Sequence, residues 1–111
     1  MAKRGQDFKL WAGDARHIVF HITDLEALEG CNLEWAYSRT AKSEPLTILK
    51  STEGDIDVDG LTVTVKVPYQ ATLGRFGRYY HELKMADGGD NPTRLAVGHI
   101  RILPSLLRRE E

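Results

Sequence analysis

The stretch Gly77–Met85, GRYYHELKM, decides the fold. Its odd-numbered positions from Tyr79 onward hold Tyr, His, Leu and Met, whereas the even-numbered positions include Glu82 and Lys84. A period of two is typical of a β-strand with one buried face. The stretch therefore predicts a central strand whose odd-numbered side chains point into a core.

A second strong β signal comes just before this strand. The run Leu61–Val67, LTVTVKV, is rich in β-branched residues and ends at Pro68, which has no N–H to donate to a ladder. The segment Pro68–Phe76 then joins two strong strands through a connection bounded by proline and glycine. We expect the chain to cross here from one sheet to another.

Shorter alternating runs fill the rest of the chain, with turn residues between them. The run Asn32–Ser38 has the bulkiest face, which includes Trp35, and we expect this run to cross the middle of the core. The spacing predicts an all-β fold, an antiparallel β-sandwich of seven or eight short strands. The remaining strands are expected at residues 8–12, 17–23, 32–38, 46–50, 56–60 and 93–103.

The last predicted strand changes its phase partway along. Leu95 and Val97 follow one alternation, and Ile100 and Ile102 follow the other. A change of phase requires one extra residue, and a glycine inside a strand is typical of such a site. We therefore expect a β-bulge at Gly98-His99.

The totals indicate a single domain. With 111 residues, the chain is long enough for one hydrophobic core. We expect an N-terminal arm at residues 1–7, the sandwich domain at 8–104 and a C-terminal tail at 105–111, both ends being flexible. No secretory signal or membrane-spanning stretch is visible, so we expect a protein that is soluble where it is made.

Charge and cysteine content exclude several classes of protein. Fifteen basic residues face sixteen acidic ones, so no general field attracts nucleic acid or an anionic membrane. Cys31 is the only cysteine, which rules out an internal disulfide and a zinc ribbon. It lacks the flanking residues that activate a catalytic nucleophile.

The histidines and aspartates do not form a metal motif. His17 and His21 share one face of a strand but lie roughly 13 Å apart along it. Asp55, Asp57 and Asp59 resemble the start of a calcium loop, but an apolar strand follows in place of further oxygen ligands. We expect no cofactor and no metal.

The order of these elements resembles the small Ig-like β-sandwich structural proteins of tailed bacteriophages, which are similar in pattern to the N-terminal domain of upper baseplate proteins. The matching pieces extend from about Phe8 to Leu103, and the most characteristic is GRYYHEL at residues 77–83. The others are Gly13-Asp14, Ile18–Thr23 with Asp24-Leu25, Leu33–Ser38, Ile56–Val67 and Gly98–Ile102.

The resemblance implies a non-enzymatic virion protein made in the host cytoplasm. It would act as a capsid decoration or tail-attached module through contacts with a major capsid or tail protein. It also implies an Ig-like sandwich with Tyr79 at the position of the corner tyrosine, whose hydroxyl bonds back to the upstream chain. A tail or baseplate adaptor is the alternative role within this class.

Exposed apolar and basic side chains are the candidate contacts with partner proteins or in a homo-oligomer. Trp11 and Val19 occupy outward phases of their strands, and the arms add further candidates. Two alternatives from other classes remain. One is a cytoplasmic binding module or small enzyme that uses His81 and His99. The other is a single-strand nucleic-acid binder, which the near-neutral charge disfavours and whose basic and aromatic residues would be Arg75, Arg78, Arg101, Tyr69, Phe76 and Tyr80. The contact residues in the arms are Lys3, Arg4, Leu106 and Leu107.

Overall fold

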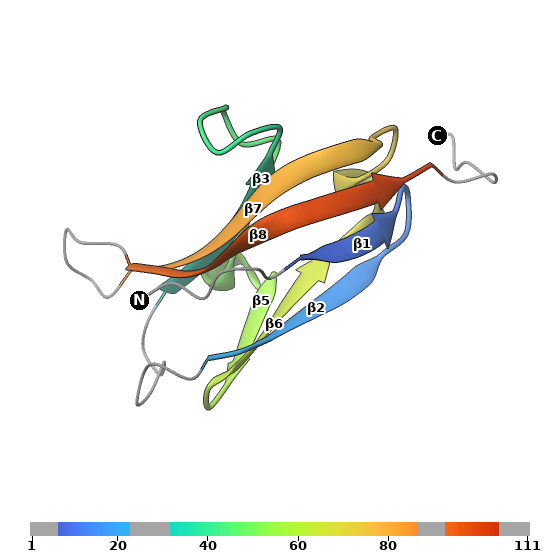
Figure 1. Ribbon diagram of the computed structural model, residues 1–111. Coiled ribbons are helices and arrows are strands. Elements are labelled where there is room, and N and C mark those ends of the chain that lie inside the picture. The colour runs from blue at the N-terminus through green and yellow to red at the C-terminus, as the bar shows by residue number, and fades with distance from the viewer. Residues whose placement is uncertain (1–6, 23–31, 87–92, 105–111) are drawn as a thin grey trace.

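The computed structural model describes residues 7–22, 32–86 and 93–104, and these residues form eight β-strands (Figure 1). Two single-turn 3₁₀ helices, η1 (Ser51–Glu53) and η2 (Tyr69–Ala71), lie in connections. The strands are β1 (Phe8–Trp11), β2 (Arg16–His21), β3 (Asn32–Ser38), β4 (Thr47–Lys50), β5 (Ile56–Asp59), β6 (Thr62–Val67), β7 (Gly77–Ala86) and β8 (Thr93–Leu103).

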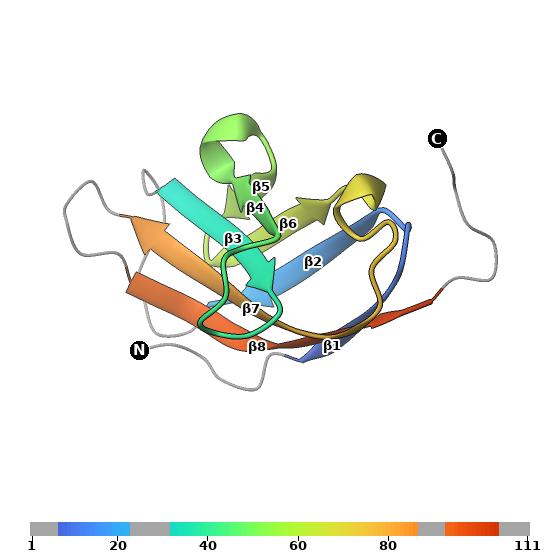
Figure 2. The same ribbon diagram turned by 90° about the horizontal axis from the view of Figure 1, so that it is seen from above.

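The strands form two sheets that pack face to face as a sandwich. One sheet has the order β1-β8-β7-β3-β4 and the other has the order β2-β6-β5. Figures 1 and 2 show the two layers from perpendicular directions. Strand β7 lies between β8 and β3 in the middle of the larger sheet, as its alternation predicts. The all-β sandwich fold is confirmed.

One pairing departs from the antiparallel pattern. Strand β1 runs parallel to β8, with Phe8 opposite Ile100 and Trp11 opposite Leu103. The two strands come from opposite ends of the chain, so no hairpin turn forces them to be antiparallel. The order β2-β6-β5 against β8-β7-β3-β4 is that of an immunoglobulin-type sandwich whose larger sheet carries an extra edge strand. The fold is therefore Ig-like.

The connection between β6 and β7 crosses between the sheets, as expected from its sequence. It includes η2 and is fixed by Thr72, which is fully buried. The Thr72 hydroxyl accepts a hydrogen bond of 2.9 Å from the backbone N–H of Gly13, in the turn between β1 and β2. Gly13 has a φ of +83°, which an L-residue with a side chain rarely adopts. This bond therefore links the two chain segments that connect the sheets at one end.

Alternating side chains of both sheets meet in one core. Leu33, Trp35 and Tyr37 of β3 are at most 1% exposed. They face Val63 and Val65 of β6, which are completely buried. Burial of apolar surface at about 25 cal/mol per Å² is the main force that holds such a core together. The expectation that the β3 face crosses the middle of the core is correct.

The predicted β-bulge is at the wrong place. His81 pairs with Gly98 and Tyr80 with His99 in regular register. The register instead shifts between Leu83 and Lys84, which pair with Ala96 and Arg94 and leave Leu95 as the extra residue. Leu95 and Ala96 are consecutive and both buried, so the change of phase falls between them.

Candidate functional site

The predicted contact residues that the structure describes lie on two opposite surfaces. Trp11 follows the buried Leu10 on β1 and is 49% exposed on the outer face of the five-stranded sheet. Val19, at 50% exposure, lies between the buried Ile18 and Phe20 on β2, on the outer face of the three-stranded sheet. The sandwich separates these two side chains, so they do not form one contact surface.

The other predicted contacts, Lys3, Arg4, Leu106 and Leu107, lie outside the described residues. Two exposed apolar side chains were missing from the expected set. Ile48 on β4 is 47% exposed and Phe76, just before β7, is 68% exposed. The alternation of Ile48 with the buried Leu49 was the sequence signal for the first of these.

The outer face of the five-stranded sheet carries a row of three cations. Lys9 on β1 is opposite Arg101 on β8, and Arg101 is opposite Arg78 on β7. Their neighbours along each strand, such as Leu10 and Ile100, are buried, so all three side chains point outward. We call Lys9, Arg101 and Arg78 the cation row. Lys9 and Arg101 are adjacent in this row although they are 92 residues apart in the sequence.

His99 lies beside the cation row on the same face. Its backbone N–H donates a hydrogen bond of 2.9 Å to Asp7 Oδ1. Its Nδ1 lies 3.4 Å from Nη2 of Arg78, which donates to it. The ring also meets the edge of Tyr80, with centroids 6.2 Å apart. These contacts hold the Arg78 guanidinium over a shallow groove of ≈ 330 Å³ that Asp7, Lys9 and Arg101 also line.

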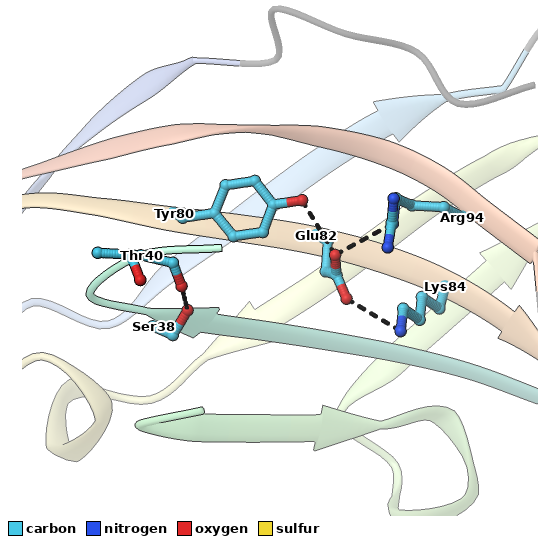
Figure 3. A network of polar contacts seen from close by, with 6 residues as sticks. All are labelled: Ser38, Thr40, Tyr80, Glu82, Lys84 and Arg94. Carbon is cyan, nitrogen blue, oxygen red and sulfur yellow. Dashed lines mark hydrogen bonds and ion pairs between the residues drawn. The ribbon is translucent and has the colours of Figure 1, made fainter. Parts of the chain in front are cut away.

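Farther along the same face, the charges are paired (Figure 3). Glu82 accepts a hydrogen bond of 3.0 Å from the Tyr80 hydroxyl. The same carboxylate forms ion pairs with Lys84, at 3.1 Å, and with Arg94, at 3.2 Å. Nearby, the Ser38 hydroxyl donates to the carbonyl of Thr40 (Figure 3). The face therefore divides into a part around Glu82, where ion pairs form, and the cation row, whose members form no ion pair with the residues that the structure describes.

The interior of the sandwich holds a hydrogen-bonded polar pair on the inner face of the five-stranded sheet. Trp35 Nε1 donates to His81 Nδ1 over 3.2 Å, and both side chains are completely buried. The ring of Phe20 on β2 lies 6.0 Å from that of His81. In antibody domains, a disulfide joins the two strands that correspond to β2 and β7, and a buried tryptophan packs against it. The second cysteine of that disulfide lies two residues after the corner tyrosine. Here Tyr79 precedes His81 by two residues, and its hydroxyl donates to the carbonyl of Phe76 over 3.0 Å.

His81 and His99 do not form a common site. His81 points into the core and lies opposite Gly98 of β8. His99, the next residue on β8, is exposed on the outer face. The two imidazoles are therefore on opposite sides of one sheet. His17 and His21 are exposed on β2, and the described residues contain no group of three side chains able to hold a metal ion. None of the described helices is long and apolar enough to cross a membrane.

Comparison with known proteins gives a distant likeness in structure. No protein-family model matches the sequence, and no curated protein matches it. Among solved structures, the chain is similar to the extracellular domain of the voltage-gated sodium channel beta4 subunit, for which parallel homodimers and a role in cell–cell adhesion are described. The identity is 10%, the TM-score is 0.42, and the match covers 96% of this chain and 97% of that chain. A likeness of this degree carries no argument about function.

Proposed function

We propose that the protein is a non-enzymatic structural module that acts through contacts with other proteins. The observation that carries this proposal is the exposure, between 47% and 68%, of the large apolar side chains Trp11, Val19, Ile48 and Phe76. A sandwich with a well-filled core has no internal need for these side chains at its surface. Contact with a partner would remove them from water and stabilise the complex.

The setting that we propose is the virion of a tailed bacteriophage. There the protein is a capsid decoration or a tail-attached module that binds a major capsid or tail protein. The support for this setting is the resemblance of the strand pattern, above all GRYYHEL at residues 77–83, to phage Ig-like structural proteins. Because the exposed Phe76 precedes β7 at the same end of the sheet as Trp11, we expect the five-stranded sheet to make the main contact.

The test is cross-linking with mass spectrometry on purified phage particles that contain the protein. Lys9 on the proposed contact face and Lys66 on β6 of the other sheet serve as reporters. Cross-links from Lys9, but few from Lys66, to one capsid or tail protein are the expected result. Absence of the protein from particles, together with a clean monomer in light scattering, would reject the virion role.

A further inference from the structure

The cation row is a local concentration of like charge in a chain whose net charge is −1. Lys9, Arg101 and Arg78 are direct cross-strand neighbours on one face, and like charges in such positions destabilise a sheet. No ion pair joins any of them to a carboxylate in the described part of the chain. Departures of this kind from local stability are typical of functional positions.

Some cations elsewhere in the described part of the chain have carboxylate partners. Lys84 and Arg94 share Glu82 on the same two strands that carry Arg78 and Arg101. On the other sheet, Lys66 pairs with Asp57 over 3.2 Å. Asp7, the carboxylate that lines the groove at the cation row, accepts the backbone N–H of His99. Asp7 keeps its negative charge in this bond, but one carboxylate against three cations leaves a net positive charge at the groove for a ligand from outside.

The groove has the geometry of a site for carboxylates. A guanidinium binds a carboxylate through two parallel hydrogen bonds, and Arg78 is already oriented by His99. Adjacent strands are about 4.8 Å apart, so the row spans about 10 Å and is wide enough for two carboxylates. A ligand with a single small anionic group would leave part of the row uncompensated.

Apolar side chains lie directly beside the cations. Trp11 is two residues beyond Lys9 on β1, and Leu103 is two residues beyond Arg101 on β8, so both keep the outward phase of the cation row. Phe76, the most exposed of the large apolar residues, precedes β7 at the same end of the sheet. Tryptophan and arginine are the residue types that most often dominate the binding energy of protein interfaces.

We propose that this face binds an acidic peptide segment of a partner protein, with at least two carboxylates next to an apolar side chain. The inference rests on the proposed contact function and names the chemistry of the partner. A peptide is favoured over a sulfated glycan or nucleic acid because the net charge of −1 supplies no long-range field for a polyanion. The adjacent Trp11 also needs an apolar group as its partner.

The experiment is selection from a displayed library of random linear peptides with the purified full chain. The enriched peptides are then measured by fluorescence anisotropy against Arg78→Ala/Arg101→Ala. The matched control is Lys84→Ala/Arg94→Ala, which removes the same charge from the same two strands. Circular dichroism and thermal melting verify that both variants fold.

We expect enriched peptides with two or more Asp or Glu beside an aromatic or aliphatic residue. Affinity should fall by at least about tenfold in Arg78→Ala/Arg101→Ala, because two charge-assisted contacts are lost. The control variant should bind within about twofold of wild type, and added salt should weaken binding by screening. Selection of peptides without acidic residues, or equal loss in both variants, would overturn the proposal. So would a heparin oligosaccharide that competes at the same residues and binds more tightly.

The outcome is separable from that of the proposed virion function. If Arg78→Ala/Arg101→Ala enters phage particles at the wild-type level, the cation row is not the contact, but the virion role stands. If wild-type protein is absent from particles and still binds acidic peptides through this row, the virion role fails and the peptide site remains.

Discussion

Tyr37 brings a titratable hydroxyl into the core of the sandwich. Burial raises the pKa of this hydroxyl above its ordinary value of 10.0, and Thr47 and Arg75 oppose the increase only in part. The hydroxyl donates to the carbonyl of Ala71, in the crossing between the sheets. The native state therefore favours the protonated tyrosine.

We predict a loss of stability in alkali that depends on Tyr37. Below about pH 10 both the folded and the unfolded chain keep this proton. Above it the unfolded chain releases the proton first, so the free energy of unfolding falls by at most about 1.4 kcal/mol per pH unit until the folded pKa is passed. Urea unfolding from pH 8 to 11 measures this slope. Tyr37→Phe should flatten it and Tyr69→Phe should not; an unchanged slope in Tyr37→Phe would contradict the assignment.

His81 and Trp35 give a second prediction at this scale. His81→Leu removes the acceptor of a fully buried indole N–H, which should lower the free energy of unfolding by about 1–3 kcal/mol. The exposed His99→Leu is the control and should change it by no more than about 0.5 kcal/mol. Chemical denaturation of the two single variants, Trp35→Phe and the double variant Trp35→Phe/His81→Leu measures the coupling. Additive effects of the two changes would show that the bond contributes little.

Among elements, β7 was the easiest to predict and the β1–β8 pair the hardest. The alternation within Gly77–Met85 depends on local sequence and identifies its buried face directly. The parallel contact of β1 with β8 depends on where two distant strands meet, and no local pattern encodes that meeting. The sequence placed Arg78 and Arg101 in one possible basic surface, but for this reason it did not place Lys9 beside them. The outward phase of Trp11 was predicted correctly.

The misplaced bulge has a related physical cause. The sequence shows only that the phase of β8 changes somewhere between Leu95 and Ile100. Ala96 and Gly98 are small enough for either face, so hydrophobicity does not locate the change. Pairing with β7 does locate it, because His81 is opposite Gly98 and Leu83 is opposite Ala96.

The cation row leads to a prediction about the three strands that carry it. Arg101→Glu places a carboxylate between Arg78 and Lys9 and turns two repulsive neighbours into attractive ones. The free energy of unfolding should rise by about 0.2–1 kcal/mol in low salt, with a smaller gain in high salt. Urea midpoints for this variant and for the neutral Arg101→Gln measure the effect. A lower midpoint in Arg101→Glu than in Arg101→Gln would show that the row is not repulsive.

For the whole molecule, the two faces of the sandwich should behave differently. Trp11→Ser should weaken binding to the partner protein by about 30-fold or more if Trp11 dominates the interface, since such side chains contribute at least about 2 kcal/mol. Val19→Ser, equally exposed on the opposite face, is the matched control and should leave binding unchanged. Surface plasmon resonance with the cross-linked partner measures both. Greater loss in Val19→Ser would move the contact to the three-stranded sheet.

The fold was predictable at this scale and the function was not. Turn residues and alternation determine which segments become strands, and a sandwich is the arrangement that buries one face of each. Binding depends on which side chains of distant strands become neighbours on the outer surface. Lys9, Arg78 and Arg101 become neighbours only through the complete strand order of the larger sheet.

The parallel pairing of β1 with β8 has a mechanical consequence. A tension that pulls the start of β1 away from the end of β8 acts along both strands, so it loads the bonds between Phe8–Trp11 and their partners together in shear. Once this patch breaks, no covalent cross-link limits extension, because Cys31 is the only cysteine, and each residue released adds up to about 3.5 Å. The domain should therefore stay rigid under moderate load and, beyond a threshold force, lengthen abruptly over the whole of its chain.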